Sequence, residues 1–117
     1  MLPIKILTMA SLGCFLSLSC SVAKGEQPIS FNSQIRPILS ENCFACHGPD
    51  REDRAADLRL DVREPAIDYG ALVEGEPDES LMVERILTDD PDLIMPPPET
   101  QKSLTTAEKR LISEWIR

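Results

Sequence analysis

The motif at residues 43–47, Cys-Phe-Ala-Cys-His, constrains what this chain can fold into more than any other part of its sequence. Two cysteines separated by two residues and followed at once by a histidine are typical of covalent c-type haem attachment. Cys43 and Cys46 can each form a thioether with a vinyl group of the haem, and His47 can bind its iron. Because a haem is a large apolar plate, a short chain that holds one is expected to fold around it.

The same residues admit two other kinds of site, a redox dithiol and a zinc site. A thioredoxin-like dithiol is expected beside a βαβ pattern, and the sequence shows none. A zinc ion bound by Cys43, Cys46 and His47 needs a fourth ligand, which only a carboxylate or Cys20 could supply. His47 is the only histidine in the chain, and its place directly after the second cysteine favours haem over both alternatives.

Residues 1–23 have the pattern of a signal peptide for export. Lys5 supplies a positive charge near the start, residues 6–18 are apolar, and small residues precede a cleavage site after Ala23. The apolar run is too short to favour a permanent membrane span. Since c-type haem is attached outside the cytoplasm in bacteria, the motif and the signal together predict a protein in the periplasm, or one that is membrane-associated outside the cytoplasm.

Cys20 offers an alternative way of processing the N-terminus. A lipid-modified cysteine normally follows a leucine and two small residues, whereas Leu18 stands one position closer to Cys20 than that pattern requires. A lipoprotein signal that ends before Cys20 would anchor the protein to a membrane. Cleavage after Ala23 instead leaves two cysteines in the mature chain, both in the haem motif, which argues against a disulfide framework.

The charge of the chain limits its partners. Its 20 acidic and 12 basic residues give a formal net charge of -8 at pH 7, which argues against nucleic acid as a partner. An acidic surface suits a redox partner with a basic docking surface, and such an association would be sensitive to salt. The same surface also serves simply to keep an exported protein soluble.

The mature chain is long enough for one small, mainly helical domain at residues 31–117, which follows a flexible leader at residues 24–30. Apolar spacing, prolines and capping residues predict its elements. These are a turn at 31–36, a helix at 37–42, an extended segment at 58–62, a helix at 77–87 opened by Glu76 or Asp78, a stiff proline loop at 92–99, and a last helix opened by a capping box at 105–108.

The second axial ligand of the iron has two candidates in the mature chain, because no second histidine is present. Met95 precedes three prolines, which would hold its backbone rigid and present its sulfur at one place. Met82 lies on the apolar face of a predicted helix, where methionine more commonly packs in a core. Met95 is therefore preferred, with Met82 or an open sixth position as the alternatives.

Residues 31–116 resemble the small class I cytochrome c domain of planctomycete-type exported proteins. The landmarks that carry this resemblance are Ile35-Arg36-Pro37-Ile38-Leu39, Cys43-Phe44-Ala45-Cys46-His47-Gly48-Pro49, Leu58-Arg59-Leu60-Asp61, Gly75-Glu76-Pro77 with Ser80-Leu81, Met95-Pro96-Pro97, and Leu111 with Trp115-Ile116. The resemblance implies an all-α fold in which the N- and C-terminal helices cross and pack around one covalent haem. It also implies that Cys43 and Cys46 carry the haem, with His47 as proximal and Met95 as distal ligand.

These patterns predict an electron carrier rather than an enzyme. An iron with two protein ligands is closed to substrates, and no carboxylate pair or other catalytic constellation competes with the haem. One alternative is the electron inlet or outlet of a larger oxidoreductase, since members of the family usually continue beyond the position of Arg117. Another is a haem-based sensor. Arg59 is a candidate to pair with a haem propionate, unless it is simply an exposed arginine.

Overall fold

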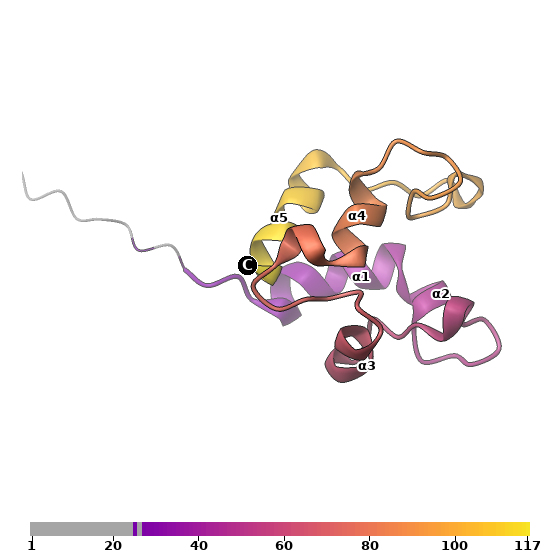
Figure 1. Cartoon of the computed structure of the whole chain (residues 1–117), viewed down its shortest axis with the longest axis horizontal. Coiled ribbons are helices and arrows are strands. Elements are labelled where there is room, and N and C mark those ends of the chain that lie inside the picture. The colour runs from indigo at the N-terminus through magenta and orange to yellow at the C-terminus, as the bar shows by residue number, and fades with distance from the viewer. Residues whose placement is uncertain (1–24, 26) are drawn as a thin grey trace, which may run out of the picture.

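A computed structural model of the protein describes residue 25 and residues 27–117 (Figure 1). The predicted signal peptide, Cys20 and part of the predicted leader lie outside the described residues. The described part is helical and contains no strand, which agrees with the predicted all-α class. Its longer helical elements are a π-helix at Phe31–Ile35 and the α-helices α1 (Arg36–Asn42), α2 (Phe44–His47), α3 (Arg63–Asp68), α4 (Leu81–Leu87) and α5 (Thr106–Ile116). Within the described residues, no helix is both long and apolar enough to cross a membrane.

The first helix follows the predicted pattern closely. The Arg36 amide donates to the Phe31 carbonyl five residues back, so the predicted turn is one stretch of π-helix that leads directly into α1. Pro37 lies in the first turn of α1, where its missing amide hydrogen costs no helical hydrogen bond. The helix ends at Asn42, and the Cys43 amide still donates to the Leu39 carbonyl at 2.8 Å. The haem motif therefore begins where this helix ends, as predicted.

The middle of the chain holds one α-helix that the sequence patterns did not predict. Residues 58–62 are not part of a strand, although the backbone at Leu58 and Val62 is extended as expected. The helix α3 follows directly, with Pro65 in its first turns and Ala66 fully buried. It is too short for a clear helical period, and its exposed Arg63 and Glu64 make the segment look irregular in sequence.

The predicted helix at 77–87 is divided by Ser80. Pro77–Glu79 forms a 3₁₀ turn, the backbone at Ser80 is extended, and α4 begins at Leu81. Glu76 stands at the N-cap position of the 3₁₀ turn without a side-chain capping hydrogen bond, and the N-cap residue of α4 is Ser80 rather than Glu76 or Asp78. The Ser80 side chain is buried, and its Oγ accepts from the Val73 amide and donates to the Glu76 carbonyl, each at 2.9 Å. These two hydrogen bonds satisfy the hydroxyl inside the core and hold the interruption in place.

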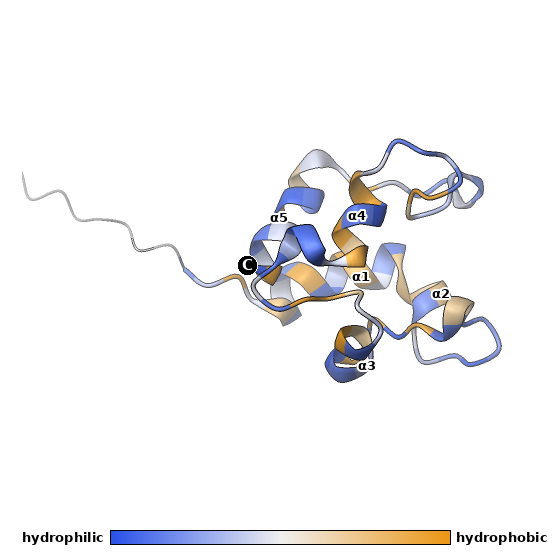
Figure 2. Ribbon diagram, viewed as in Figure 1, coloured by the Kyte–Doolittle hydropathy of each residue, from blue (hydrophilic) through white to orange (hydrophobic). Residues whose placement is uncertain are grey.

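The last helix joins the two ends of the domain. In α5 the side chain of Thr105 accepts from the Glu108 amide at 3.2 Å, and the Glu108 carboxylate accepts from the Thr105 amide at 2.7 Å, so the predicted capping box is confirmed. The helix packs on the π-helical segment, with the rings of Phe31 and Trp115 centred 5.4 Å apart. Figure 2 shows hydrophobic residues on both α1 and α4, and both helices contribute to the core. The core consists of Ile35, Ile38, Leu39, Leu60, Ala66, Ala71, Leu72, Met82, Val83, Ile86, Leu104, Ile112 and Ile116.

Replacing Thr105 with alanine is expected to lower the free energy of unfolding by about 1 kcal/mol, because the Glu108 amide at the start of α5 loses the side-chain oxygen that accepts its hydrogen bond. Urea unfolding of the haem-loaded protein measures this loss. Thr106→Ala is the matched control, since Thr106 is exposed and its side chain takes no part in the capping box. Equal losses in the two variants would show that the box does not stabilise the helix.

Candidate haem site

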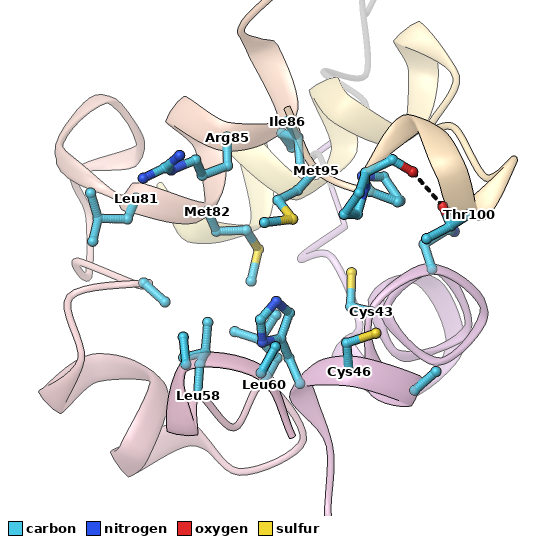
Figure 3. Close-up of a pocket in the computed structure, with 18 of the residues that line it drawn as sticks. Cys43, Cys46, Leu58, Leu60, Leu81, Met82, Arg85, Ile86, Met95 and Thr100 are labelled. Carbon is cyan, nitrogen blue, oxygen red and sulfur yellow. Dashed lines mark hydrogen bonds between the residues drawn. The ribbon is translucent and has the colours of Figure 1, made fainter. Parts of the chain in front are cut away.

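One apolar cavity of about 360 Å³ brings together the residues predicted to attach the haem or to ligate its iron (Figure 3). Its walls come from the end of α1, from α2, from the segment after α2, from α4 and from the loop that follows α4. The sulfurs or imidazole of five residues lie along these walls: Cys43, Cys46, His47, Met82 and Met95. The cavity therefore offers two thiols, one imidazole and two thioethers to a single occupant.

The helix α2 holds the haem motif in a single turn. The His47 amide donates to the Cys43 carbonyl at 2.8 Å, and the His47 carbonyl accepts from the Leu60 amide at the same distance. Behind this turn, Gly48 is buried against the Phe44 carbonyl, and a Cβ atom on Gly48 would lie 2.2 Å from that oxygen. The residue after the histidine must consequently be glycine for the chain to leave α2 along this path.

Two methionines face the motif from the other wall. Figure 3 shows the side chains of Met82 and Met95 reaching into the cavity, across from Leu58 and Leu60. Met82 was expected mainly to pack in the core, and it is indeed buried there, but it also lines the cavity. Met95 lies in the loop after α4, where its amide donates to the Arg85 carbonyl at 2.9 Å. Both predicted candidates for the distal ligand are thus near the same space.

Comparison with known families decides what kind of domain this is. Residues 43–99, from the first cysteine of the motif to the end of the proline loop, match the family described as Planctomycete cytochrome C. The chain carries a planctomycete-type cytochrome c domain. No curated protein and no solved structure matches the chain. Membership of this family implies a haem-binding, electron-transfer domain with covalently attached haem c.

The chemistry of the cavity in this cytochrome c domain fits such a haem. Nδ1 of His47 is buried without a hydrogen-bond partner, and buried polar atoms rarely lack one unless a bound group supplies it. Burial lowers the pKa of His47, with an opposing effect from the backbone of Ala55, so the neutral imidazole that ligates metals is favoured. Both thiols are free, Cys46 being exposed and Cys43 half-buried. Burial raises the pKa of Cys43 to about 11, against the charge of Lys102, which lowers it.

Among the residues that the structure describes, we find no group of three or more His, Cys, Asp or Glu side chains placed to hold a metal ion. The zinc site that the motif also admitted would have needed such a group. Cys20, one of its two possible sources of a fourth ligand, lies outside the described residues.

Arg59, the predicted candidate for a haem propionate, does not line the cavity of the cytochrome c domain. Its Nε donates to Oδ1 of Asp61 at 3.0 Å, and a second guanidinium nitrogen pairs with Oδ2. The hydrogen bond from Arg59 holds the pKa of Asp61 below its usual range. The guanidinium thus already has a carboxylate partner inside the chain.

Sequence reasoning missed two cations that do line the cavity, Arg85 and Lys102. Arg85 follows Met82 by three residues on α4 and Leu81 by four, so helical periodicity alone could have placed it beside them. Lys102 lies beyond the proline loop and gave no comparable signal. Its position depends on how that loop returns to α1.

Proposed function

We propose that this protein is an exported electron carrier with one c-type haem bound to Cys43 and Cys46 and axially ligated by His47 and Met95. The observation that carries the proposal is the convergence of two free thiols, one imidazole and two thioethers on one apolar cavity. When bound, the haem supplies an iron that takes up and releases one electron. The side chains of the protein must attach the haem, ligate its iron and keep water away from it.

The two cysteines fix the cofactor without any added oxidant or leaving group. Each thiol would add across one vinyl group of a bound haem, so that a carbon–sulfur bond would form and the thiol hydrogen would pass to the other vinyl carbon. The single turn of α2 holds Cys43 and Cys46 in one short segment, with His47 immediately next to the second thiol. Two thioethers to the haem would keep the neighbouring His47 imidazole beside the iron.

Met95 suits the distal position better than Met82 because of how each is held. Met82 is 7% exposed and belongs to the hydrophobic core, so drawing its sulfur toward an iron would disturb packing around α4. Met95 is half-buried in a loop outside that core, where Pro96 and Pro97 restrict its backbone and a hydrogen bond ties it to Arg85. A thioether ligand favours the ferrous state and raises the reduction potential.

The apolar walls support electron transfer rather than catalysis. Leu58, Leu60 and Ile86 line the cavity, and such side chains keep water and small substrates from a bound iron. The contact between α5 and the π-helical segment supports a class I cytochrome c arrangement around the haem. The signal pattern at residues 1–23 supports export, and the net charge of -8 supports a partner with a basic docking surface.

Absorption spectra of the matured protein in both oxidation states test this function. A low-spin spectrum in both states, with a weak near-infrared sulfur-to-iron band in the oxidised protein, is the expected result. An oxidised spectrum of high-spin, five-coordinate iron would contradict His/Met ligation and favour a protein that binds ligands at the iron. Reversible binding of carbon monoxide by the reduced protein would point the same way, since a ligated sulfur resists exchange.

A further inference from the structure

Two cations line the cavity, and they differ in whether a carboxylate neutralises them. Nζ of Lys102 donates to the Glu41 carbonyl and lies 3.6 Å from that residue's Oε1. Arg85 forms no ion pair with any described residue, and its one side-chain hydrogen bond, to the Leu93 carbonyl, spans 3.5 Å. Arg85 is half-buried at the cavity wall, and its guanidinium is free to pair with an anion that enters the cavity.

The two cations also lie at different ends of the cavity. Lys102 contacts Glu41, two residues before Cys43, so this lysine lies on the side of the two thiols. Figure 3 shows Arg85 beside Leu81, across the cavity from Cys43 and Cys46. Tyr69 lies on the same side of the cavity as Arg85. Gly70, the residue after Tyr69, accepts a hydrogen bond at its carbonyl from the Leu81 amide at 3.1 Å.

The chemistry of the haem indicates what the far side of the cavity, at Arg85, would bind. A haem carries its vinyl groups and its two propionates at opposite edges, so thioethers at the cysteines direct the carboxylates away from them. A planar guanidinium is suited to bind a carboxylate through two parallel hydrogen bonds. A propionate carboxylate would therefore lie on the side of the cavity formed by Arg85, Leu81 and Tyr69, where it needs a positively charged partner.

We propose that Arg85 is the propionate-binding residue of this domain and that its positive charge raises the reduction potential of the haem. The proposal rests on the proposed function, because it needs a covalently bound haem. The direction of this change in reduction potential follows from electrostatics. Oxidation adds one positive charge to the iron, so a nearby cation, and a propionate that it neutralises, both favour the ferrous state. The role is one of binding and tuning, and the iron ligands are unaffected.

The test compares three variants of the haem-loaded protein at constant ionic strength. Arg85→Gln removes the charge, Arg85→Lys retains it without the planar fork, and Arg36→Gln is the control. Arg36 is exposed on α1, forms no ion pair with the described residues and does not line the cavity, so its loss changes the net charge equally. Spectroelectrochemical titration gives the ratio of ferric to ferrous protein, and the near-infrared band reports whether the iron ligands are intact.

Arg85→Gln is expected to increase the ferric-to-ferrous ratio at a fixed ambient potential by about three- to tenfold, with the near-infrared band unchanged. Arg36→Gln should change the ratio by less than about twofold, since exposed charges are screened, and Arg85→Lys should fall between them. In the ferrous wild-type protein, nuclear Overhauser effects are expected between the Arg85 guanidinium and the propionate methylene protons.

A wild-type protein that shows these Overhauser effects supports the proposal even if Arg85→Gln fails to fold. A wild-type protein with a normal His/Met spectrum, no such effects, and no larger response to Arg85→Gln than to Arg36→Gln overturns the role of Arg85 alone. A wild-type protein that carries no haem overturns the proposed function itself, so the two failures are distinguishable.

Discussion

Replacing Met95 with alanine is expected to abolish the near-infrared sulfur-to-iron band of the oxidised protein and to convert the iron to a high-spin or water-ligated form. Alanine offers no atom that can bind the metal, and the loop that presents residue 95 is held by its hydrogen bond to Arg85. The reduction potential should fall as well, because the thioether favours the ferrous state. Absorption spectra and a redox titration of the haem-loaded variant measure both changes.

Met82→Leu is the matched control for this experiment. Leucine nearly conserves the volume of methionine, so the core around α4 should lose less than about 1.5 kcal/mol, while the sulfur is removed. The near-infrared band should survive in this variant. If Met82→Leu loses the band and Met95→Ala keeps it, then the ligand comes from α4 and the assignment of Met95 is wrong.

Replacing both Cys43 and Cys46 with alanine is expected to abolish covalent haem completely. No thiol remains in the motif to add to a vinyl group, and outside these two positions the described residues contain no other cysteine. Each single variant should retain one thioether. Intact-protein mass under denaturing conditions distinguishes the three cases, because only covalent haem stays with the unfolded chain.

Ala45→Ser controls for disturbance of the motif itself. This residue is exposed between the two cysteines, and its replacement should leave the added mass of one haem unchanged. Haem that remains covalently bound to the double cysteine variant would show attachment at another side chain. That result would overturn the assignment of Cys43 and Cys46 as the attachment sites.

The parts of the fold that sequence predicted well are those fixed by neighbouring residues. Pro37 can stand only near the start of a helix, and the Thr105–Glu108 capping box needs nothing beyond four residues, so α1 and α5 were placed close to their observed bounds. The division before α4 depends instead on Ser80 finding Val73 and Glu76 as hydrogen-bond partners in the folded core. No local propensity predicts an encounter of that kind.

In the candidate site, too, the features set by neighbouring residues were predictable from the sequence, and those set by tertiary packing were not. The spacing of Cys43, Cys46 and His47 is a local chemical pattern, and it was sufficient to name the cofactor. Which arginine faces the cavity depends on tertiary packing. Arg59 is occupied by Asp61 two residues away, whereas Arg85 reaches the cavity because α4 turns it to the side of Met82.

The hydrogen bond between the Met95 amide and the Arg85 carbonyl bears on how fast the protein could exchange electrons. It couples the loop of the proposed distal ligand to the helix that carries the proposed propionate partner, so the two would move as one body. A ligand held in this way has little room to shift when the iron changes charge. The reorganisation energy would then be small, and electron transfer to a partner would need only a modest driving force.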